Sequence, residues 1–183
     1  IHISALERVI QELDLDLLAV AAEPFAVARS VIGDNANATM NAILMDVGGG
    51  TTDIAVINEG GVQGTKMFGI GGRAFTKSIE RDLSVDYEMA EKLKLNFSAR
   101  DEKDMSQHEA VADALDKTCD VWLSGVELAL SEYTDLENLP HQILLCGGGA
   151  SLKKLTGILR ETNWYAQLPF TRKPHISLID PSQ

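Results

Sequence analysis

Cysteine and basic charge are both scarce in this sequence, and each scarcity excludes a class of protein. The 183 residues contain two cysteines, Cys119 and Cys146, too few for a disulfide framework and without zinc-ligand spacing. Lysine and arginine number 16 against 27 acidic residues, a net charge of −11, which disfavours nucleic-acid binding. No apolar run reaches the ~18 residues of a membrane span. The sequence starts at Ile1 with neither an initiator methionine nor a basic leader, so we expect a piece of a longer cytosolic protein without a signal peptide.

The acidic charge is concentrated in one part of the chain. Of the 27 acidic residues, 16 lie between Thr76 and Leu139, against 7 of the 16 basic ones. Such an excess is typical of a solvated helical face, and a surface for a basic partner is the alternative.

Hydrophobic spacing predicts strands towards both ends of the chain with a helical block between them. This order favours an α/β body with a helical insertion. A charged linker is expected at Asn96–Ser106, and an extended chain after Trp164. The expected helices are Ser4–Leu15, Glu23–Ile32, Arg73–Leu83, Tyr87–Leu95, Gln107–Tyr133 and Ser151–Glu161, and the expected strands are Leu17–Ala21, Ala42–Val47, Ile54–Ile57, Val62–Ile70 and Gln142–Cys146.

The first glycine turn, within the stretch LMDVGGGTTD from Leu44 to Asp53, is the most informative motif. Successive glycines let backbone amides approach a ligand that any Cβ would block. Asp46 ends a buried strand beside the turn, and a carboxylate there is the hard oxygen ligand that Mg²⁺ prefers, often through water. Threonine hydroxyls add further donors. The residues expected to cradle phosphates are Gly48, Gly49, Gly50, Thr51 and Thr52.

Two common phosphate loops do not fit this turn. A Walker loop needs Gly-Lys-Ser/Thr, which the sequence lacks. A dinucleotide-binding loop continues into a helix, whereas Ile54–Ile57 is strand-like. The motif therefore predicts a phosphate turn at the tip of a β-hairpin, with a plain glycine-rich hairpin as the alternative.

A second glycine turn joins a strand to a helix. Gly147, Gly148 and Gly149 follow the strand Gln142–Cys146 and precede the helix that begins near Ser151. Free amides at a helix start, together with the helix dipole, favour an anionic or polar ligand group. Strand–glycine–helix is also a common way to turn tightly. The presence of the first turn upstream favours the interpretation of the second as a ligand-binding turn. We expect both turns to meet around one triphosphate.

These two turns, in this order and spacing, resemble the second phosphate motif and the adenosine motif of the actin/DnaK/sugar-kinase ATPase superfamily. Ala22-Glu23-Pro24 resembles its first connecting helix, which implies that Glu23 orients the hydrolytic water. Gly71-Gly72-Arg73-Ala74-Phe75 resembles the entry to its second small subdomain, and Ala90-Glu91-Lys92-Leu93-Lys94 resembles a motif of the MreB and FtsA groups. The resemblance implies that Arg73, Glu91 and Lys94 surround the adenosine. An exposed i,i+3 ion pair is the alternative for the last two.

The resemblance also implies a fold. It is an actin-like, ribonuclease H-like ATPase domain with a mixed sheet flanked by helices. Residues 1–70 and 141–183 would form a nucleotide-binding α/β subdomain, and residues 71–140 an inserted, mostly helical subdomain. The short linker and the run Phe-Thr-Lys-Ser-Ile-Glu are closest to FtsA- or PilM-type scaffolds of cell division or type IV pilus assembly.

The functional expectation is one side of an ATP–Mg²⁺ site, with Asp46 holding the metal and Glu23 and Asp46 as the catalytic residues. The first phosphate motif of the superfamily is not found, so this chain alone should hydrolyse ATP hardly at all. The resemblance implies self-association or division and pilus-assembly partners, at the cytoplasmic face of the inner membrane, with the membrane reached only indirectly. A sugar- or acetate-type kinase and a non-hydrolysing binding module are the alternatives.

Overall fold

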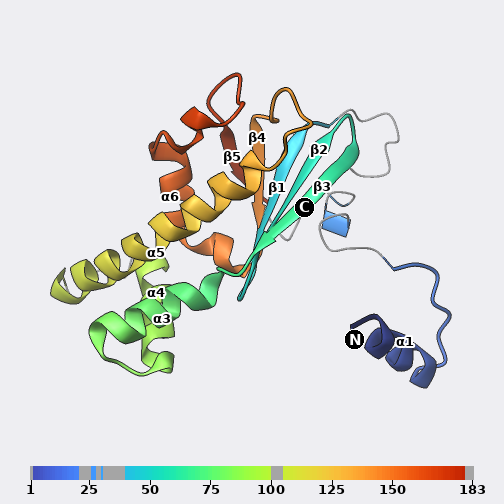
Figure 1. The fold of residues 1–183 in the computed structure, drawn as a ribbon. Coiled ribbons are helices and arrows are strands. Elements are labelled where there is room, and N and C mark those ends of the chain that lie inside the picture. The colour runs from blue at the N-terminus through green and yellow to red at the C-terminus, as the bar shows by residue number, and fades with distance from the viewer. Residues whose placement is uncertain (1, 21–25, 28–29, 31–39, 100–104, 180–183) are drawn as a thin grey trace.

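A five-stranded mixed sheet forms the body of the chain. The computed structural model describes residues 2–20, 26–27, 30, 40–99 and 105–179 (Figure 1). The strand order is β3-β2-β1-β4-β5; β3, β2 and β1 pair antiparallel, whereas β1–β4 and β4–β5 are parallel. The strands are β1 Ala42–Val47, β2 Thr52–Asn58, β3 Gly61–Phe68, β4 Gln142–Cys146 and β5 His175–Leu178.

The central strands are almost wholly apolar because both of their faces are covered. β1 is AILMDV, and all of its residues except Asp46 are buried. β3 lies at an edge and alternates between exposed and half-buried residues. The most deeply buried part of the sheet is therefore formed by β1, β2 and β4. The two glycine turns lie at the ends of these strands.

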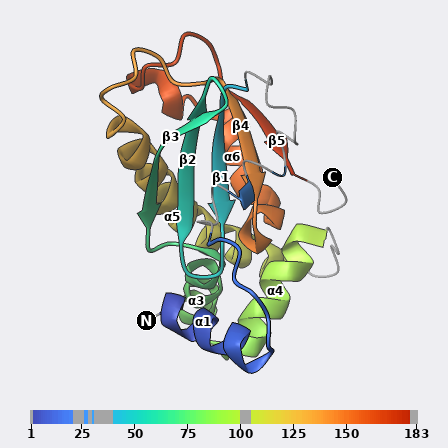
Figure 2. The ribbon, with the colours of Figure 1, turned by 90° about the vertical axis from the view of Figure 1, so that its right-hand side faces the viewer.

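Among the described residues, three α-helices lie between β3 and β4 in sequence, and a fourth follows β4. Figure 2 shows the long helix α5 beside the sheet, with α3 and α4 beyond the sheet's lower end. The helices are α1 His2–Glu12, α3 Gly72–Leu83, α4 Tyr87–Ala99, α5 Met105–Ser131 and α6 Lys153–Glu161, with short 3₁₀ turns η1 Gly148–Ser151 and η2 Trp164–Gln167.

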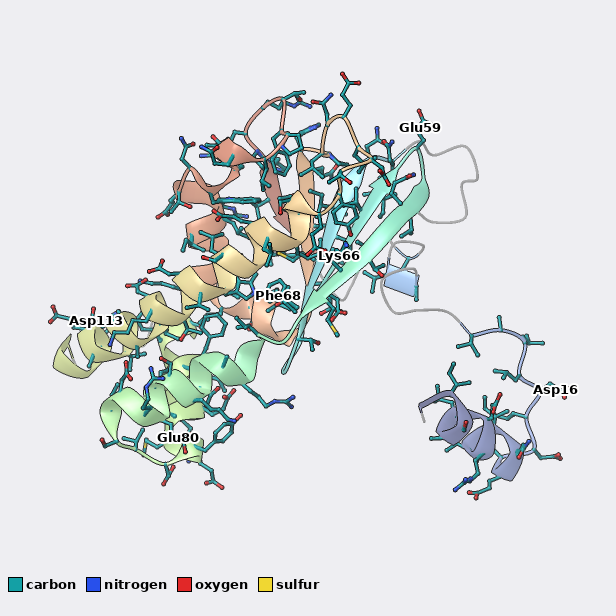
Figure 3. The ribbon with its side chains drawn as sticks, viewed as in Figure 1. Asp16, Glu59, Lys66, Phe68, Glu80 and Asp113 are labelled. Carbon is teal, nitrogen blue, oxygen red and sulfur yellow. The ribbon has the colours of Figure 1, made fainter. Side chains whose placement is uncertain are left out.

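One apolar cluster joins the sheet to these helices. Trp122 of α5 is fully buried in it, together with Phe75 and Ile79 of α3 and Leu155 of α6. Phe68, at the end of β3, lies under α5 (Figure 3), and a Cβ on Gly125 would stand 2.8 Å from its ring. The close approach of β3 to α5 thus depends on a glycine in the C-terminal part of that helix.

The opposite sheet face carries a second, smaller cluster. Ala42, Leu44, Ala55 and Leu144 are buried there, and Val27 packs against them. Because side chains alternate along a strand, Asp46 continues the row of Ala42 and Leu44. Asp46 therefore lies on the face away from the main core.

Most of the predicted elements are confirmed, and two predictions are wrong. The charged linker expected at Asn96–Ser106 is shorter than predicted, because α4 runs to Ala99 and α5 begins at Met105. The helix expected at Glu23–Ile32 lies largely outside the described residues. Residues 17–20 form no strand and Leu18 is 95% exposed, since no described strand pairs with them. The extended chain expected after Trp164 is confirmed at β5, which pairs with β4, whereas η2 at its start was not expected. The division into subdomains at residues 70 and 140 stays a prediction, because α5 packs on both the sheet and the other helices.

Helix α1 lies apart from the remaining elements in Figure 1. Its apolar residues Ile3, Leu6 and Val9 are each more than half exposed. Within the described residues, no helix combines the length and apolar character that crossing a membrane requires.

Candidate functional site

The first glycine turn is fastened to the start of α3. Gly48 N–H donates to Thr51 O at 2.9 Å, which closes the hairpin between β1 and β2. Gly72 N–H then donates to Gly48 O at 2.9 Å, and Arg73 N–H to Gly49 O at 2.8 Å. A Cβ on the preceding residue, Gly71, would lie only 2.5 Å from Gly48 O. The turn is thus a preformed loop held by a helix N-terminus.

The second glycine turn packs against the end of β1. Gly147 has φ +83°, and a Cβ there would meet Val47 O at 2.6 Å and collide with the Asp46 carboxylate. Gly149 is similar, because its Cβ would lie 2.8 Å from Val47 O. Around Gly148, by contrast, nothing lies within 4 Å of a built Cβ. The two turns therefore meet in space, as the sequence predicts, and Gly148 faces open space beside them.

A cavity of about 240 Å³ lies where the turns meet α3 and α4. Its size suits part of a small ligand, since whole ligand pockets usually span ~300–1,000 Å³. Tyr87, Leu95 and Ser98 of α4 contribute to its wall. The predicted site residues that line it are Gly48, Gly49, Arg73, Glu91, Lys94, Gly148 and Gly149.

Glu91 and Lys94 form an ion pair inside this cavity. Lys94 Nζ lies 2.8 Å from Glu91 Oε2, and their side chains are 12% and 35% exposed for lysine and glutamate respectively. Burial alone would raise the pKa of Glu91, but hydrogen bonds from Lys94 and Thr76 and the Lys94 charge outweigh it and hold that pKa below its ordinary value. The stabilisation from this pair is present above the ordinary glutamate pKa and is lost as the pH falls through the lowered one.

Arg73 lies at the phosphate turn itself. A Cβ on Gly49 would stand 3.6 Å from Arg73 Nη1, and a Cβ on Gly50 would stand 3.4 Å from Arg73 Cζ. The side chain is exposed, and among the described residues no carboxylate forms an ion pair with it. Its guanidinium is therefore available to an anion resting on the glycines.

Asp46 lies opposite a second carboxylate. In the β1–β2 ladder Asp46 pairs with Asp53, and Asp53 accepts a 3.1 Å hydrogen bond from the Thr51 hydroxyl. Like charges directly opposite in a sheet are destabilising, so a bound cation would relieve them. Their hard oxygens suit Mg²⁺. In the described part of the chain no three metal-ligating side chains come together, so ligand oxygens or water would have to complete the metal's shell.

Thr52 corrects one of the sequence-based expectations. Its side chain is fully buried, its hydroxyl donates to Ile70 O at 2.7 Å, and the same oxygen accepts from Trp122 Nε1 at 2.9 Å. The hydroxyl therefore serves the core and does not face the turn, because Thr52 shares the strand face of Ile54. Glu23, the expected water-orienting residue, lies outside the described residues.

Replacing Thr52 with valine is expected to destabilise the protein by about 1–3 kcal/mol, because the Trp122 N–H loses its acceptor in a dry core. Thr52→Ser keeps the oxygen and should cost less. Thermal unfolding of both variants checks this, and a valine variant as stable as the serine one would contradict the importance of the hydrogen bond.

A larger cavity of about 600 Å³ lies elsewhere, between α5 and α6. Phe97 and His108 stack at one side of it with ring centroids 4.5 Å apart, and Asp116 pairs with Lys154 at 2.8 Å. It contains neither glycine turn nor any predicted site residue. Size alone therefore does not identify the functional site.

Comparison with known families gives one match over most of the chain. The family described as "Cell division protein FtsA" matches residues 43–180. The FtsA of Pseudomonas aeruginosa is 26% identical over 177 residues, which cover 85% of this chain and 42% of that protein. The chain thus spans less than half the length of this curated relative.

Solved structures with the same fold include a two-protein complex and a nucleotide-bound protein. The PilM–PilN type IV pilus biogenesis complex matches with a TM-score of 0.71 at 17% identity, covering 98% of this chain and 47% of that one. MreB5 of Spiroplasma citri bound to ADP matches with a TM-score of 0.61 at 20% identity, covering 97% and 60%. These likenesses confirm the predicted fold class, a mixed α/β actin-like domain.

Proposed function

Because this chain belongs to the FtsA family, within the actin-like ATPase superfamily, we propose that it forms one side of an ATP–Mg²⁺ site in a bacterial cell-division scaffold. The observation that carries the proposal is the meeting of the two glycine turns at one cavity. The ADP bound to the fold relative MreB5 supports a nucleotide as its ligand.

Each group of residues would contact a different part of the nucleotide. The backbone amides of Gly49 and Gly50 would approach the phosphates, with the Arg73 guanidinium beside them, while Gly48 N–H closes the turn through Thr51 O. Gly147, Gly148 and Gly149 would pass under the α-phosphate and ribose, and Glu91 would face the nucleoside. Such a site acts by placement and charge stabilisation more than by covalent chemistry.

Asp46 and the opposite Asp53 would hold Mg²⁺, mainly through water, and the ion would neutralise phosphate charge. Glu23 would orient the attacking water, a role that rests on the motif resemblance. A further domain of the intact protein would supply the opposite wall of the site, so ATP hydrolysis would require the intact protein.

Nucleotide binding would bias an assembly state at the cytoplasmic face of the inner membrane, through division-protein partners or self-association. A pilus-assembly scaffold is the second candidate, favoured by the fold match to PilM in its complex with PilN. Sedimentation of the intact protein with purified division or pilus-assembly partners, with and without ATP, separates the two. Turnover measured with and without a sugar or acetate acceptor separates an ATPase from a kinase and from a non-hydrolysing module.

Gly148→Val tests the site itself. Because Gly148 faces open space, the valine fits the fold but occupies the cavity, so we expect ATP to bind the intact protein at least about tenfold more weakly, roughly 1.4 kcal/mol. Calorimetry measures the affinity and thermal unfolding shows that the fold survives.

Gly157→Val is the matched control. Gly157 lies in α6 beside the larger cavity and also has nothing within 4 Å of a built Cβ. Its ATP affinity should equal that of the wild type. Equal affinities for both variants would count against the proposed site.

A further inference from the structure

The Thr76 hydroxyl lies at the centre of a partly buried network behind the cavity. Thr76 is fully buried in α3. Its Oγ1 lies 2.5 Å from Glu91 Oε2, 2.8 Å from Lys94 Nζ and 3.2 Å from Gly72 O. The network thus joins the first turn of α3, which holds the phosphate turn, to the two cavity-lining residues of α4.

Lys94 uses all of its hydrogen-bond donors within this network. An ammonium group has three N–H donors. Those of Lys94 are directed to Gly72 O at 3.2 Å, Thr76 Oγ1 at 2.8 Å and Glu91 Oε2 at 2.8 Å. No donor is left over for a ligand. Lys94 therefore connects α3 to α4 and is less suited to contact a ligand.

Glu91, in contrast, keeps one oxygen for a ligand. The hydrogen bonds from Thr76 and Lys94 both end on Oε2, so Oε1 accepts from neither. The side chain remains partly exposed and lines the cavity. Because both network bonds favour the charged form, Glu91 is an ionised acceptor near neutral pH. A carboxylate accepts hydrogen bonds only, so the matching ligand group must be a donor.

We propose that Thr76 is a positioning residue of this cavity, which aims Glu91 so that its second oxygen accepts a hydrogen bond from the nucleoside part of the ligand. The ligand donor is a ribose hydroxyl or a base amino group. This inference rests on the proposed nucleotide site and adds a residue that never touches the ligand.

The alternative is that Thr76 only staples α3 to α4. A staple would affect stability, whereas a positioning residue affects affinity in a way that depends on Glu91. Thr76→Val keeps the shape and removes the hydroxyl, and Thr76→Ser keeps the hydroxyl and removes a methyl group. The two variants are therefore matched for separating the roles.

The experiment measures ATP affinity of the intact protein by calorimetry, for the wild type, Thr76→Val, Thr76→Ser, Glu91→Gln and the double variant Thr76→Val/Glu91→Gln. Loss of a hydrogen bond to a charged group predicts about tenfold weaker binding for Thr76→Val, with Thr76→Ser restored to within about twofold of the wild type. Glu91→Gln should weaken binding similarly, and the double variant should be little worse than either single one. ATP, 2′-deoxy-ATP and inosine triphosphate distinguish the donors, because the analogue that lacks the contacted donor should lose less in Thr76→Val.

Multiplicative effects of the two substitutions, or an unchanged affinity in Glu91→Gln, would overturn the inference. The Glu91→Gln arm decides this even where Thr76→Val does not fold, since Glu91 is partly exposed. If the wild type binds no ATP, the proposed function itself fails and takes this inference with it. If the wild type binds and Glu91→Gln binds equally well, only the role of Thr76 fails.

Discussion

Replacing Gly147 with alanine is expected to destabilise the protein by about 2–4 kcal/mol, which is large for the addition of one methyl group. Two effects combine. The backbone at Gly147 has φ +83°, a conformation that L side chains rarely adopt, and a Cβ would lie 2.6 Å from Val47 O. Neither atom can move easily, because Val47 belongs to β1 at the centre of the sheet. Thermal and urea unfolding of the intact protein measure the loss.

Gly148→Ala is the matched control for this prediction. The two glycines are neighbours in one turn, but Gly148 has free space and no positive φ. Its alanine variant should unfold within about 0.5 kcal/mol of the wild type, the usual range for surface positions. Equal stability of the two variants would contradict the tight contact between the second turn and β1.

Replacing Asp46 with alanine is expected to weaken Mg-ATP binding to the intact protein at least about a hundredfold, roughly 2.7 kcal/mol. The carboxylate lies at the end of β1, directly beside the second glycine turn and opposite Asp53. Its removal takes away the hard oxygen ligand that the proposed metal needs. Calorimetry in the presence of Mg²⁺ measures the change, and with EDTA the difference between the two proteins should shrink.

Asp46→Asn sharpens the test. It keeps the side-chain shape and removes a charge that faces Asp53, so the ligand-free variant should be as stable as the wild type or more stable. A variant that is stable and yet fails to bind Mg-ATP would assign the carboxylate to the ligand. Unchanged Mg-ATP affinity in either variant would count heavily against the metal role.

The local signals of the sequence predicted the parts of the site that depend on glycine and on apolar runs. β1 and β4 were expected with their observed bounds, because short apolar runs that end at a turn of glycines are typical of buried strands. The meeting of the two turns followed from their resemblance to known motifs. The two turns pack closely only because positions 147 and 149 carry no side chain, and the sequence shows directly that both are glycines, Gly147 and Gly149.

Long-range contacts were the part that sequence could not supply. The Glu91–Lys94 pair is visible as an i,i+3 spacing, but its third member, Thr76, lies on another helix. The direction of Thr52 was predictable, because it alternates in phase with Ile54 along β2 and so faces the core. The strand β5 was missed since it has four residues and follows a proline at position 174.

Helix α5 has a consequence for how the molecule can respond to a ligand. It runs without interruption for 27 residues, about 40 Å at the usual rise per residue. Its first half packs with α3, and its second half anchors to the sheet through the bond from Trp122 to Thr52. Bending between the helical end and the sheet would have to break this continuous helix. We therefore expect the domain to close on its nucleotide as one rigid body, with the hinge outside it.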